Sequence, residues 1–328
     1  MKAVILSAYG DVDKLELRDL PEPKPGPSEV MVRMVGSGLN PIDWKLRSGA
    51  LKSMMPLVFP AILGRDASGE VVEVGPGVTR LKVGARVMGL VNGAYAELVV
   101  AREDAWVEVP ANMDLIDAAA LPLVLLTGAQ LVEEAVRPQK GDVVLVTGAV
   151  GSVGRAAVFV AKTSGAHVWA GVRATQRVEA AKLGADGVVA LDNDAEIAKL
   201  PPLDGIADTV GGPTLAKLFA RMKPGGTIGS VVGEPAGAKE RGFVVRGGMT
   251  HPDAARLGAL AHAVAERKLA IPIVKRFPLA QAREAQELAE HHAGGKVLLT
   301  GARSAREPLQ PTHGQPRKSQ SKAEAAAR

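Results

Sequence analysis

The stretch that decides the fold is VVLVTGAVGSVG, residues 143–154, in which apolar and β-branched residues lead into three glycines. The run Val143–Thr147 predicts a short buried strand, and a helix is expected to follow the glycines. At such a junction glycine permits a tight turn, lets backbone N–H groups approach a pyrophosphate, and allows the helix to pack closely on the strand. The spacing GxxGxxG differs from the usual GxGxxG, so a purely structural turn is the alternative.

The segment after the next predicted strand, residues 170–177, indicates which cofactor such a loop accepts. A cofactor without a 2′-phosphate normally meets an Asp or Glu about twenty residues beyond the glycines. Here the segment has no carboxylate and carries Arg173 and Arg177, whose guanidinium groups can pair with a phosphate in bidentate fashion. The sequence therefore predicts NADPH rather than NADH. Ordinary solvated surface arginines are the alternative.

Beyond about residue 123 the chain alternates between helix-length segments and short apolar runs. The runs predict buried strands at residues 143–147, 167–171, 187–191, 205–209 and 227–232. Residues 252–268 illustrate the helices, because Leu257, Leu260 and Val264 recur at helical spacing. This alternation predicts βαβ units and therefore an α/β fold with a doubly wound, parallel Rossmann sheet.

The first third of the chain predicts a different kind of domain. Clusters of Pro and Gly separate apolar runs at residues 3–6, 30–35, 67–74, 86–88 and 94–99, as expected for a mainly antiparallel, barrel-like β domain. Residues 271–274 and Lys296–Thr300 again predict strands, so the chain is expected to return to this domain. We therefore divide the chain into residues 1–123 (first domain), 124–270 (Rossmann domain), 271–301 (return segment) and 302–328 (basic tail).

The composition excludes several classes of protein. The 328 residues include no cysteine, which excludes disulfides, thiol nucleophiles and thiolate zinc sites. Most of the net charge of +5 lies in residues 302–328, where six basic and two acidic residues stand among Pro, Gln and Ser. Such a segment buries too little apolar surface to offset its ordering entropy. It is expected to be a disordered, solvated tail, and no nucleic-acid partner is expected.

Two further features concern the cellular location. No apolar run is expected to reach the roughly 20 residues that a membrane span needs. Residues 1–10 lack the charged start, apolar middle and cleavage site of a signal peptide. We therefore expect a cytoplasmic protein with no membrane partner.

A set of short motifs, in a fixed order along the chain, resembles one family of enzymes. The motifs are GLNPID (38–43), GRDASG (64–69), GAYAE (93–97), ALP (120–122), the glycine stretch (148–154), DTVGG (208–212), KPGG (223–226) and GKVLL (295–299). With them the chain resembles the zinc-free quinone oxidoreductase branch of the medium-chain dehydrogenase/reductase superfamily, which includes zeta-crystallin and the plant alkenal reductases. The resemblance covers residues 1 to about 301.

This resemblance implies how the domains are arranged and whether a metal is present. The first domain and the return segment form one GroES-like catalytic domain, with the active site in the cleft beside the Rossmann domain. A homodimer is also implied, for which residues 243–245 offer an edge strand. In the zinc members of the superfamily a Cys matches Asn40 and a His matches Arg65. An amide and a guanidinium cannot replace these ligands, so no catalytic metal is expected.

The resemblance also assigns roles to individual residues. Asn40 lines the nicotinamide cleft, where its side-chain N–H can donate to the substrate oxygen; a structural turn at Asn40-Pro41 is the alternative. Asp43 orients Asn40 or caps a helix at residues 44–46, and Arg65 completes the candidate catalytic set. The candidate cofactor-binding residues are Thr127, Gly148, Ala149, Gly151, Ser152, Val153, Gly154, Arg173, Arg177, Val210, Gly211, Val232, Gly233 and Lys296.

The expected function is an oxidoreductase that transfers hydride from NADPH to a small electrophile, either a quinone or the β-carbon of an enone or enal. Some relatives carry a tyrosine proton donor after the Asn-Pro-x-Asp segment, but residues 44–55 contain none. Lys45, Lys52 or water remain as possible donors. Because no acid is obvious, a second hypothesis is an NADPH-binding structural or regulatory protein with little turnover.

Overall fold

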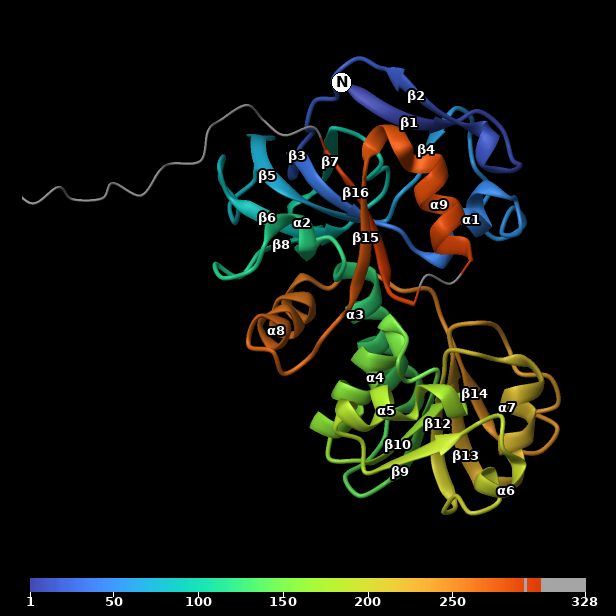
Figure 1. Ribbon diagram of the computed structural model, residues 1–328. Coiled ribbons are helices and arrows are strands. Elements are labelled where there is room, and N and C mark those ends of the chain that lie inside the picture. The colour runs from blue at the N-terminus through green and yellow to red at the C-terminus, as the bar shows by residue number, and fades with distance from the viewer. Residues whose placement is uncertain (292–293, 302–328) are drawn as a thin grey trace, which may run out of the picture.

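A six-stranded parallel sheet forms the lower domain of the chain, shown as a computed structural model in Figure 1. The structure describes residues 1–291 and 294–301, so the predicted basic tail lies outside the described residues. In spatial order the strands are β11 (Gly187–Ala190), β10 (His167–Val172), β9 (Val143–Thr147), β12 (Leu203–Asp208), β13 (Met222–Ser230) and β14 (Val244–Arg246). All neighbours are parallel, and the strand order reverses between β9 and β12. This is the predicted doubly wound sheet, and its switch point is where such sheets bind ligands.

A long apolar helix links the two domains. It consists of α2 (Leu115–Ala118), α3 (Pro122–Gln130) and η3 (Leu131–Val136), the last with π-helical hydrogen bonds. The stretch Leu115–Val136 is long and apolar enough to cross a membrane, with a mean hydropathy of 1.8, and 67% of its most apolar window is buried inside the protein. The expectation that no apolar run reaches this length was wrong. The run packs between α4, β13 and α8, where its apolar side chains become core.

The helices of the lower domain pack closely because the residues on their buried faces are small and apolar. In α4 (Ser152–Thr163) the buried face includes Ala156, Ala157 and Val160. A Cβ atom added to Gly128 of α3 would lie only 2.6 Å from the Cβ of Ala156, so these two helices cross at close range. The other helical elements of this domain are η4 (Ala174–Gln176), α5 (Arg177–Ala180), η5 (Ala181–Leu183), α6 (Asp194–Ile197), α7 (Gly212–Leu218) and η6 (Phe219–Arg221).

The upper domain contains two sheets. The larger has the order β15 (Ile273–Pro278), β16 (Lys296–Thr300), β3 (Glu29–Gly38), β5 (Asp66–Val74), β6 (Arg86–Leu90) and β8 (Trp106–Glu108), with β7 (Leu98–Arg102) also paired to β3. The smaller has the order β2 (Leu15–Asp19), β1 (Lys2–Leu6) and β4 (Ala61–Ile62). All strand pairs are antiparallel except β15–β16. The helical elements are η1 (Val12–Lys14), α1 (Pro41–Arg47), η2 (Glu103–Ala105), η7 (Leu279–Gln281) and α9 (Ala282–Glu290).

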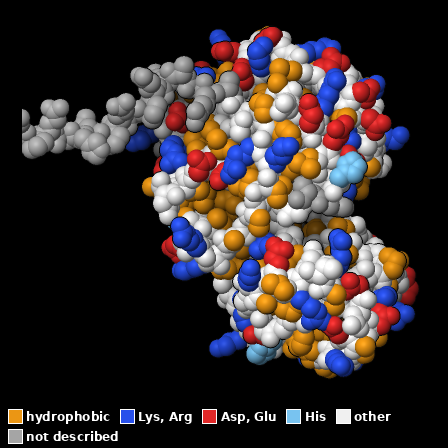
Figure 2. All heavy atoms as spheres, viewed as in Figure 1, with side chains coloured by type: hydrophobic (Ala, Val, Ile, Leu, Met, Phe, Trp, Pro, Cys, Tyr) orange, Lys and Arg blue, Asp and Glu red, His pale blue; other side chains and the backbone are white. Residues whose placement is uncertain are grey.

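The last described strand, β16, returns the chain to the upper domain, where it pairs with a strand from the beginning of the chain. β16 pairs antiparallel with β3, with Leu298 opposite Gly38. Before this return, α8 (Ala254–Ala265) packs against β8 and α3. Figure 1 shows that β16 begins at the end of the upper domain nearest the lower one, and Figure 2 shows that the molecule narrows between the two domains. Residues near the start of β16 therefore face the boundary between the domains.

One predicted strand is placed differently in the structure. Residues 94–99 were expected to be extended throughout, but β7 begins only at Leu98. Before it, the chain turns inward, because the N–H of Tyr95 donates to Leu63 O at 3.0 Å and its carbonyl accepts from Val4 N at 2.8 Å. Tyr95 is fully buried by this turn. The prediction of one continuous strand was therefore wrong for residues 94–97, where Tyr95 enters the core and Ala96 forms an isolated antiparallel bridge with Ala3 of β1.

Candidate active site

Three loops meet at the carboxyl ends of β9, β12 and β13. A Cβ atom added to Gly148, after β9, would lie 2.4 Å from Thr209 Oγ1, in the loop after β12. A Cβ atom added to Gly211 would lie 2.8 Å from a methyl carbon of Val232, in the loop after β13. The structure thus brings together the predicted residues Gly148, Val210, Gly211, Val232 and Gly233 at the switch point of the sheet. Val210 and Val232 are 48% and 43% exposed, so an apolar surface is open at this point.

The glycine loop itself has the geometry of an anion site. Gly148 has a φ of 62°, and a Cβ atom added to Gly154 would lie 2.2 Å from the carbonyl oxygen of Gly148. Larger residues are therefore excluded at both positions. Gly151 is the N-cap of α4 and offers no side chain to the first N–H groups of the helix, those of Ser152 and Val153. Such N–H groups bind phosphate, so the loop fits the pyrophosphate of a dinucleotide.

The two predicted phosphate-binding arginines differ in their surroundings. Arg173, at the end of β10, is exposed, and no side-chain partner for it is found among the described residues. Arg177 forms an ion pair with Glu196, whose carboxylate also accepts from Ala190 N at 3.0 Å. The expectation that both guanidinium groups are available for a phosphate is therefore corrected. Arg173 is available, whereas Arg177 is held at the start of α5.

A carboxylate that the sequence analysis overlooked holds the loops after β12 and β13 in place. Asp208 is fully buried at the end of β12. Its oxygens accept from Thr147 Oγ1 at 2.7 Å and Ser230 Oγ at 2.9 Å, and from the N–H groups of Val210 (3.2 Å) and Gly211 (3.0 Å). A carboxylate with four donors is well satisfied. The signal for it was an Asp placed directly at the end of an apolar strand in the motif DTVGG.

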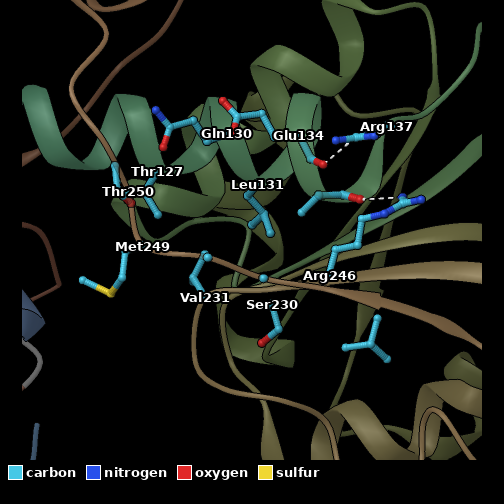
Figure 3. Close-up of a pocket in the computed structure, with 14 residues that line it drawn as sticks. Thr127, Gln130, Leu131, Glu134, Arg137, Ser230, Val231, Arg246, Met249 and Thr250 are labelled. Atoms are coloured by element: carbon cyan, nitrogen blue, oxygen red, sulfur yellow. Dashed lines mark hydrogen bonds between the residues drawn. The ribbon is translucent and has the colours of Figure 1, made fainter. Parts of the chain in front are cut away.

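A cavity of about 480 Å³ lies beside these loops (Figure 3). Thr127 of α3 lines it from one side, Ser230 and Val231 from another, and the segment 245–250 forms a further part of its wall. The hydroxyl of Thr127 forms a hydrogen bond of 2.7 Å with that of Thr250. The predicted nicotinamide residue Thr127 is therefore at this cavity, and segment 245–250, including Met249, is a further part of the site that the sequence analysis missed.

A second group of polar residues is buried in the upper domain where β3, β5 and β16 meet. Asn40 is 1% exposed, and both ends of its amide are used. Its Nδ2 donates to Asp66 Oδ2 at 2.8 Å and to Gly38 O at 3.2 Å, and its Oδ1 accepts from Lys296 Nζ at 2.7 Å. The proposed donation from Asn40 to a substrate oxygen is corrected accordingly, because neither amide N–H is free in this arrangement.

The ammonium group of Lys296 belongs to this buried group and not to the cofactor loops. It is 4% exposed and donates to Leu39 O at 2.8 Å and to Asn40, and it lies 3.3 Å from Asp66 Oδ2. Three donors thus meet three acceptors inside the protein. In this arrangement no donor of Lys296 remains for a ligand, so the structure gives no support to its predicted place in the cofactor-binding set.

Asp43 has a structural position next to this group. Its Oδ2 accepts from the backbone N–H of Asn40 at 2.8 Å, at the start of α1, and from Tyr95 Oη at 3.0 Å. Its Oδ1 is buried and has no hydrogen-bond partner. Burial raises the pKa of the Asp43 carboxyl to about 7, and burial also raises the pKa of Tyr95 well above its usual range. The structure thus supports both roles considered for Asp43, orienting Asn40 and capping α1.

The chain matches two protein families: the alcohol dehydrogenase GroES-like domain over residues 26–111 and the zinc-binding dehydrogenase family over residues 183–299. It is 30% identical over 323 residues to the chloroplast envelope quinone oxidoreductase homolog of Arabidopsis thaliana, covering 91% of this chain and 98% of that protein. It is 31% identical over 325 residues to the quinone oxidoreductase of Pseudomonas aeruginosa, with 91% and 99% covered. The chain belongs to the medium-chain dehydrogenase/reductase superfamily.

The fold agrees with this membership of the medium-chain dehydrogenase/reductase superfamily. The structure of the quinone oxidoreductase from Coxiella burnetii superposes with a TM-score of 0.81 at 31% identity, covering 92% of this chain and 99% of that chain. The predicted fold class, a Rossmann sheet with a GroES-like domain, is confirmed. Enzymes of this superfamily bind a nicotinamide cofactor, and the loops after β9, β12 and β13 are suited to one.

A catalytic zinc, which the superfamily allows, does not fit the residues of this member. The only oxygen that Asn40 can offer a metal already accepts from the ammonium group of Lys296. The guanidinium group of Arg65 would add a second positive charge at the matching histidine position. In the part of the chain that the structure describes, no three His, Cys, Asp or Glu side chains form a group able to hold a metal ion. The donor set therefore lacks zinc ligands.

Proposed function

We propose that the protein is an NADPH-dependent, zinc-independent reductase of quinones or α,β-unsaturated carbonyls. The observation that carries the proposal is the set of three loops at the switch point of the lower sheet, beside a cavity of about 480 Å³. A quinone oxidoreductase and a quinone oxidoreductase homolog align with this chain over nearly their whole length. A cofactor loop, an open apolar surface and a cavity of ligand size are the parts that such a reaction needs.

The choice of NADPH is supported by charge. Arg173 is exposed at the end of β10, where cofactors without a 2′-phosphate normally meet a carboxylate. One carboxylate also lies nearby, because Asp192 Oδ1 accepts a hydrogen bond from the backbone N–H of Ala174 at 2.9 Å. The surroundings of Arg173 are therefore not uniformly basic. Arg173 is then the residue that supplies a positive charge for a 2′-phosphate. Its side chain can reach a ligand because no described residue pairs with it.

The reduced nicotinamide supplies a hydride when it is bound, and the protein supplies position and charge. The buried amides and carboxylates described above keep the wall of the site rigid, because each polar atom of Asn40 has a partner. The exposed methyl groups of Val210 and Val232 offer an apolar surface for a flat ring. An electron-poor acceptor needs no metal to polarise it, in keeping with the missing zinc ligands.

A steady-state screen tests the proposal. NADPH and NADH oxidation are measured with 1,4-benzoquinone, 2-cyclohexen-1-one and trans-2-hexenal, with cyclohexanone as the saturated control. We expect turnover with at least one of the conjugated acceptors, a higher kcat/KM for NADPH, and no change after dialysis against a chelator. Absence of turnover with tight NADPH binding would instead favour the second candidate, a structural or regulatory NADPH-binding protein. Loss of activity on chelation, restored by zinc, would contradict the metal-free part.

We also propose a cytoplasmic homodimer. β14 ends the six-stranded sheet and pairs only with β13 among the described strands, and Val244 on it is 40% exposed. Two such edges can pair to form a continuous sheet. Light scattering during gel filtration should give twice the mass of 34.0 kDa, and replacing Val245 with Pro should shift it to the monomer.

A further inference from the structure

Arg65 differs from the other arginines that the protein shields from solvent. Among the described residues, each of the others donates to an acceptor; these are Arg47, Arg86, Arg155, Arg177, Arg221, Arg246 and Arg256. Arg65 is half-buried, its Nε is buried without a partner, and its guanidinium makes no hydrogen bond or ion pair within this part of the chain. A shielded donor without an acceptor is costly, so its presence requires an explanation.

The neighbours of Arg65 place it at the boundary between the two domains. The next residue, Asp66, accepts from Leu123 N at 2.7 Å, at the start of α3, and lies 3.3 Å from Lys296 Nζ, at the start of β16. Both elements begin at the end of the upper domain that faces the lower one (Figure 1). The carbonyl of Arg65 accepts from Val91 N at 2.8 Å, so the segment around Val91 runs beside it. Arg65 therefore lies near the start of the helix that carries Thr127.

The other polar groups on this side have partners already. The amide of Asn40 and the ammonium group of Lys296 satisfy each other and Asp66. The hydroxyl of Tyr95 donates to Asp43, and that of Thr127 pairs with Thr250. Among these groups, Arg65 is the one cation whose donors are unused. A ligand that brings a negative charge to the domain boundary can therefore accept hydrogen bonds from it.

We propose that Arg65 is a catalytic residue, whose guanidinium group binds the carbonyl oxygen of the acceptor and stabilises the negative charge that develops there. This inference rests on the proposed function and names the group that the reaction otherwise lacks. A planar guanidinium can direct two converging N–H groups at one oxygen, or donate two parallel hydrogen bonds to that oxygen and to a bridging water. Preorganised donors of this kind are the usual means of stabilising an oxyanion.

The chemical balance assigns the proton to water and not to Arg65. The enone gains a hydride from NADPH at its β-carbon, where a C–H bond forms, and NADPH is oxidised to NADP⁺. The C=C electron pair shifts toward the carbonyl, which becomes an enolate oxygen beside Arg65. Water then protonates the α-carbon, leaving hydroxide and the saturated carbonyl. A quinone similarly gives the hydroquinone anion, whose charge is on oxygen. Arginine stays protonated throughout, so it holds charge and transfers no proton.

Kinetics of three variants form the first part of the test. Arg65→Met and Arg65→Gln should lower kcat about 100-fold, the effect of removing one oxyanion donor, while the Kd for NADPH stays within about twofold. Arg65→Lys should retain part of the rate because it keeps the charge. Arg80→Met is the matched control, since Arg80 is an exposed arginine of the same domain. It should match the wild type. Two neutral variants keep the test valid if one of them fails to fold.

A binding measurement separates charge stabilisation from a structural role. 4-Nitrophenol, whose anion has a distinct visible absorbance, imitates the oxyanion, and it is titrated into protein saturated with NADP⁺ at one pH and ionic strength. The wild type and Arg80→Met should bind the anion preferentially, so its absorbance rises at a pH where the free phenol is mostly neutral. Arg65→Met and Arg65→Gln should lose this rise. An equal rise in all variants would overturn the proposal.

The two readouts distinguish failure of this inference from failure of the proposed function. If the wild type turns over and the neutral Arg65 variants keep both the kcat and the anion signal, the role of Arg65 is refuted and the reductase stands. If no conjugated acceptor turns over, the reductase is refuted. An Arg65-dependent anion signal in that case still supports Arg65 as the oxyanion-binding group. A loss of kcat with an unchanged anion signal would count against the role proposed here.

Discussion

The cofactor loops of the lower domain and the buried polar group of the upper domain use polar atoms in opposite ways. The loops leave backbone donors free, as at Ser152 and Val153, and keep them free by means of glycine. The buried group of Asn40, Asp66 and Lys296 pairs its donors and acceptors with each other. The difference teaches that donors left free at an open loop are available to a ligand, whereas the mutually paired groups of the upper domain hold the site in shape.

Replacing Lys296 with Met should have the largest effect on stability. The substitution leaves the carboxylate of Asp66, which is fully buried, without its cation. Breaking a buried ion pair in this way typically costs about 3 to 5 kcal/mol in the free energy of unfolding. Urea unfolding measures this loss, with Lys182→Met, at an exposed lysine, as the control. If Lys296→Met instead weakens NADPH binding at unchanged stability, Lys296 belongs with the cofactor loops and the comparison fails.

Replacing Asp43 with Asn should change how stability depends on pH. The folded pKa of Asp43 is about 7, above an unfolded value of about 3.9, so the native state binds this proton more tightly. Its contribution is fully present below pH 4 and is lost as the pH rises through 7. From pH 5 to pH 8 the wild type should therefore lose about 2 to 3 kcal/mol relative to Asp43→Asn.

Urea unfolding at several pH values provides the measurement for Asp43. Asp11→Asn, at an exposed carboxylate, serves as the control and should follow the wild type. Parallel curves for the wild type and Asp43→Asn would show that this carboxyl has an ordinary pKa in the folded protein. Asp43 would then be a buried carboxylate that is already ionised at pH 5, in addition to Asp66.

Replacing Arg173 with Asp should shift cofactor preference on the side of the loops. A partly exposed charge-assisted contact contributes about 1.5 to 3 kcal/mol, so NADPH binding should weaken about ten- to a hundredfold. The new carboxylate can also accept from the ribose hydroxyls of NADH. The ratio of kcat/KM for NADPH to that for NADH, at one ionic strength, measures the shift. A wild type that already prefers NADH would contradict the assignment of the phosphate site.

The smallest effect is expected for Arg177→Ala. Because Arg177 is paired with Glu196, removing it should change the NADPH to NADH ratio by less than about threefold. The same kinetic assay as for Arg173 applies. A drop comparable to that of Arg173→Asp would mean that the ion pair opens when the cofactor binds.

The sequence predicted the lower domain well because its signals are local. The strand Val143–Thr147 was placed with the right bounds, and the glycine spacing indicated the loop between β9 and α4. Apolar runs, glycine and helix periodicity each depend on neighbours within a few residues. The cofactor residues at the switch point, by contrast, were named from the resemblance to the family, and the structure brings them together.

The roles of Asn40, Lys296 and Arg177 could not be predicted in the same way. Lys296 meets Asn40 across 256 positions of the chain, and Arg177 meets Glu196 from a separate helix. Pattern alone shows that such a residue is polar, but not which partner it finds. Tyr95 is a similar case, because its burial depends on a turn held by Leu63 and Val4. Only the pairing of distant strands decides these contacts.

The seam between β3 and β16 has a consequence for synthesis on the ribosome. Gly38 of β3 lies opposite Leu298 of β16, so β3 cannot form this pairing until 260 further residues have been synthesised. At about 5 to 20 residues per second, this delay is on the order of tens of seconds. During that time the contiguous lower domain can fold, whereas the upper one has Asp66 without the ammonium group of Lys296. A nascent chain cut short before Lys296 therefore has one domain that can be complete and one that lacks the strand and the cation that close it.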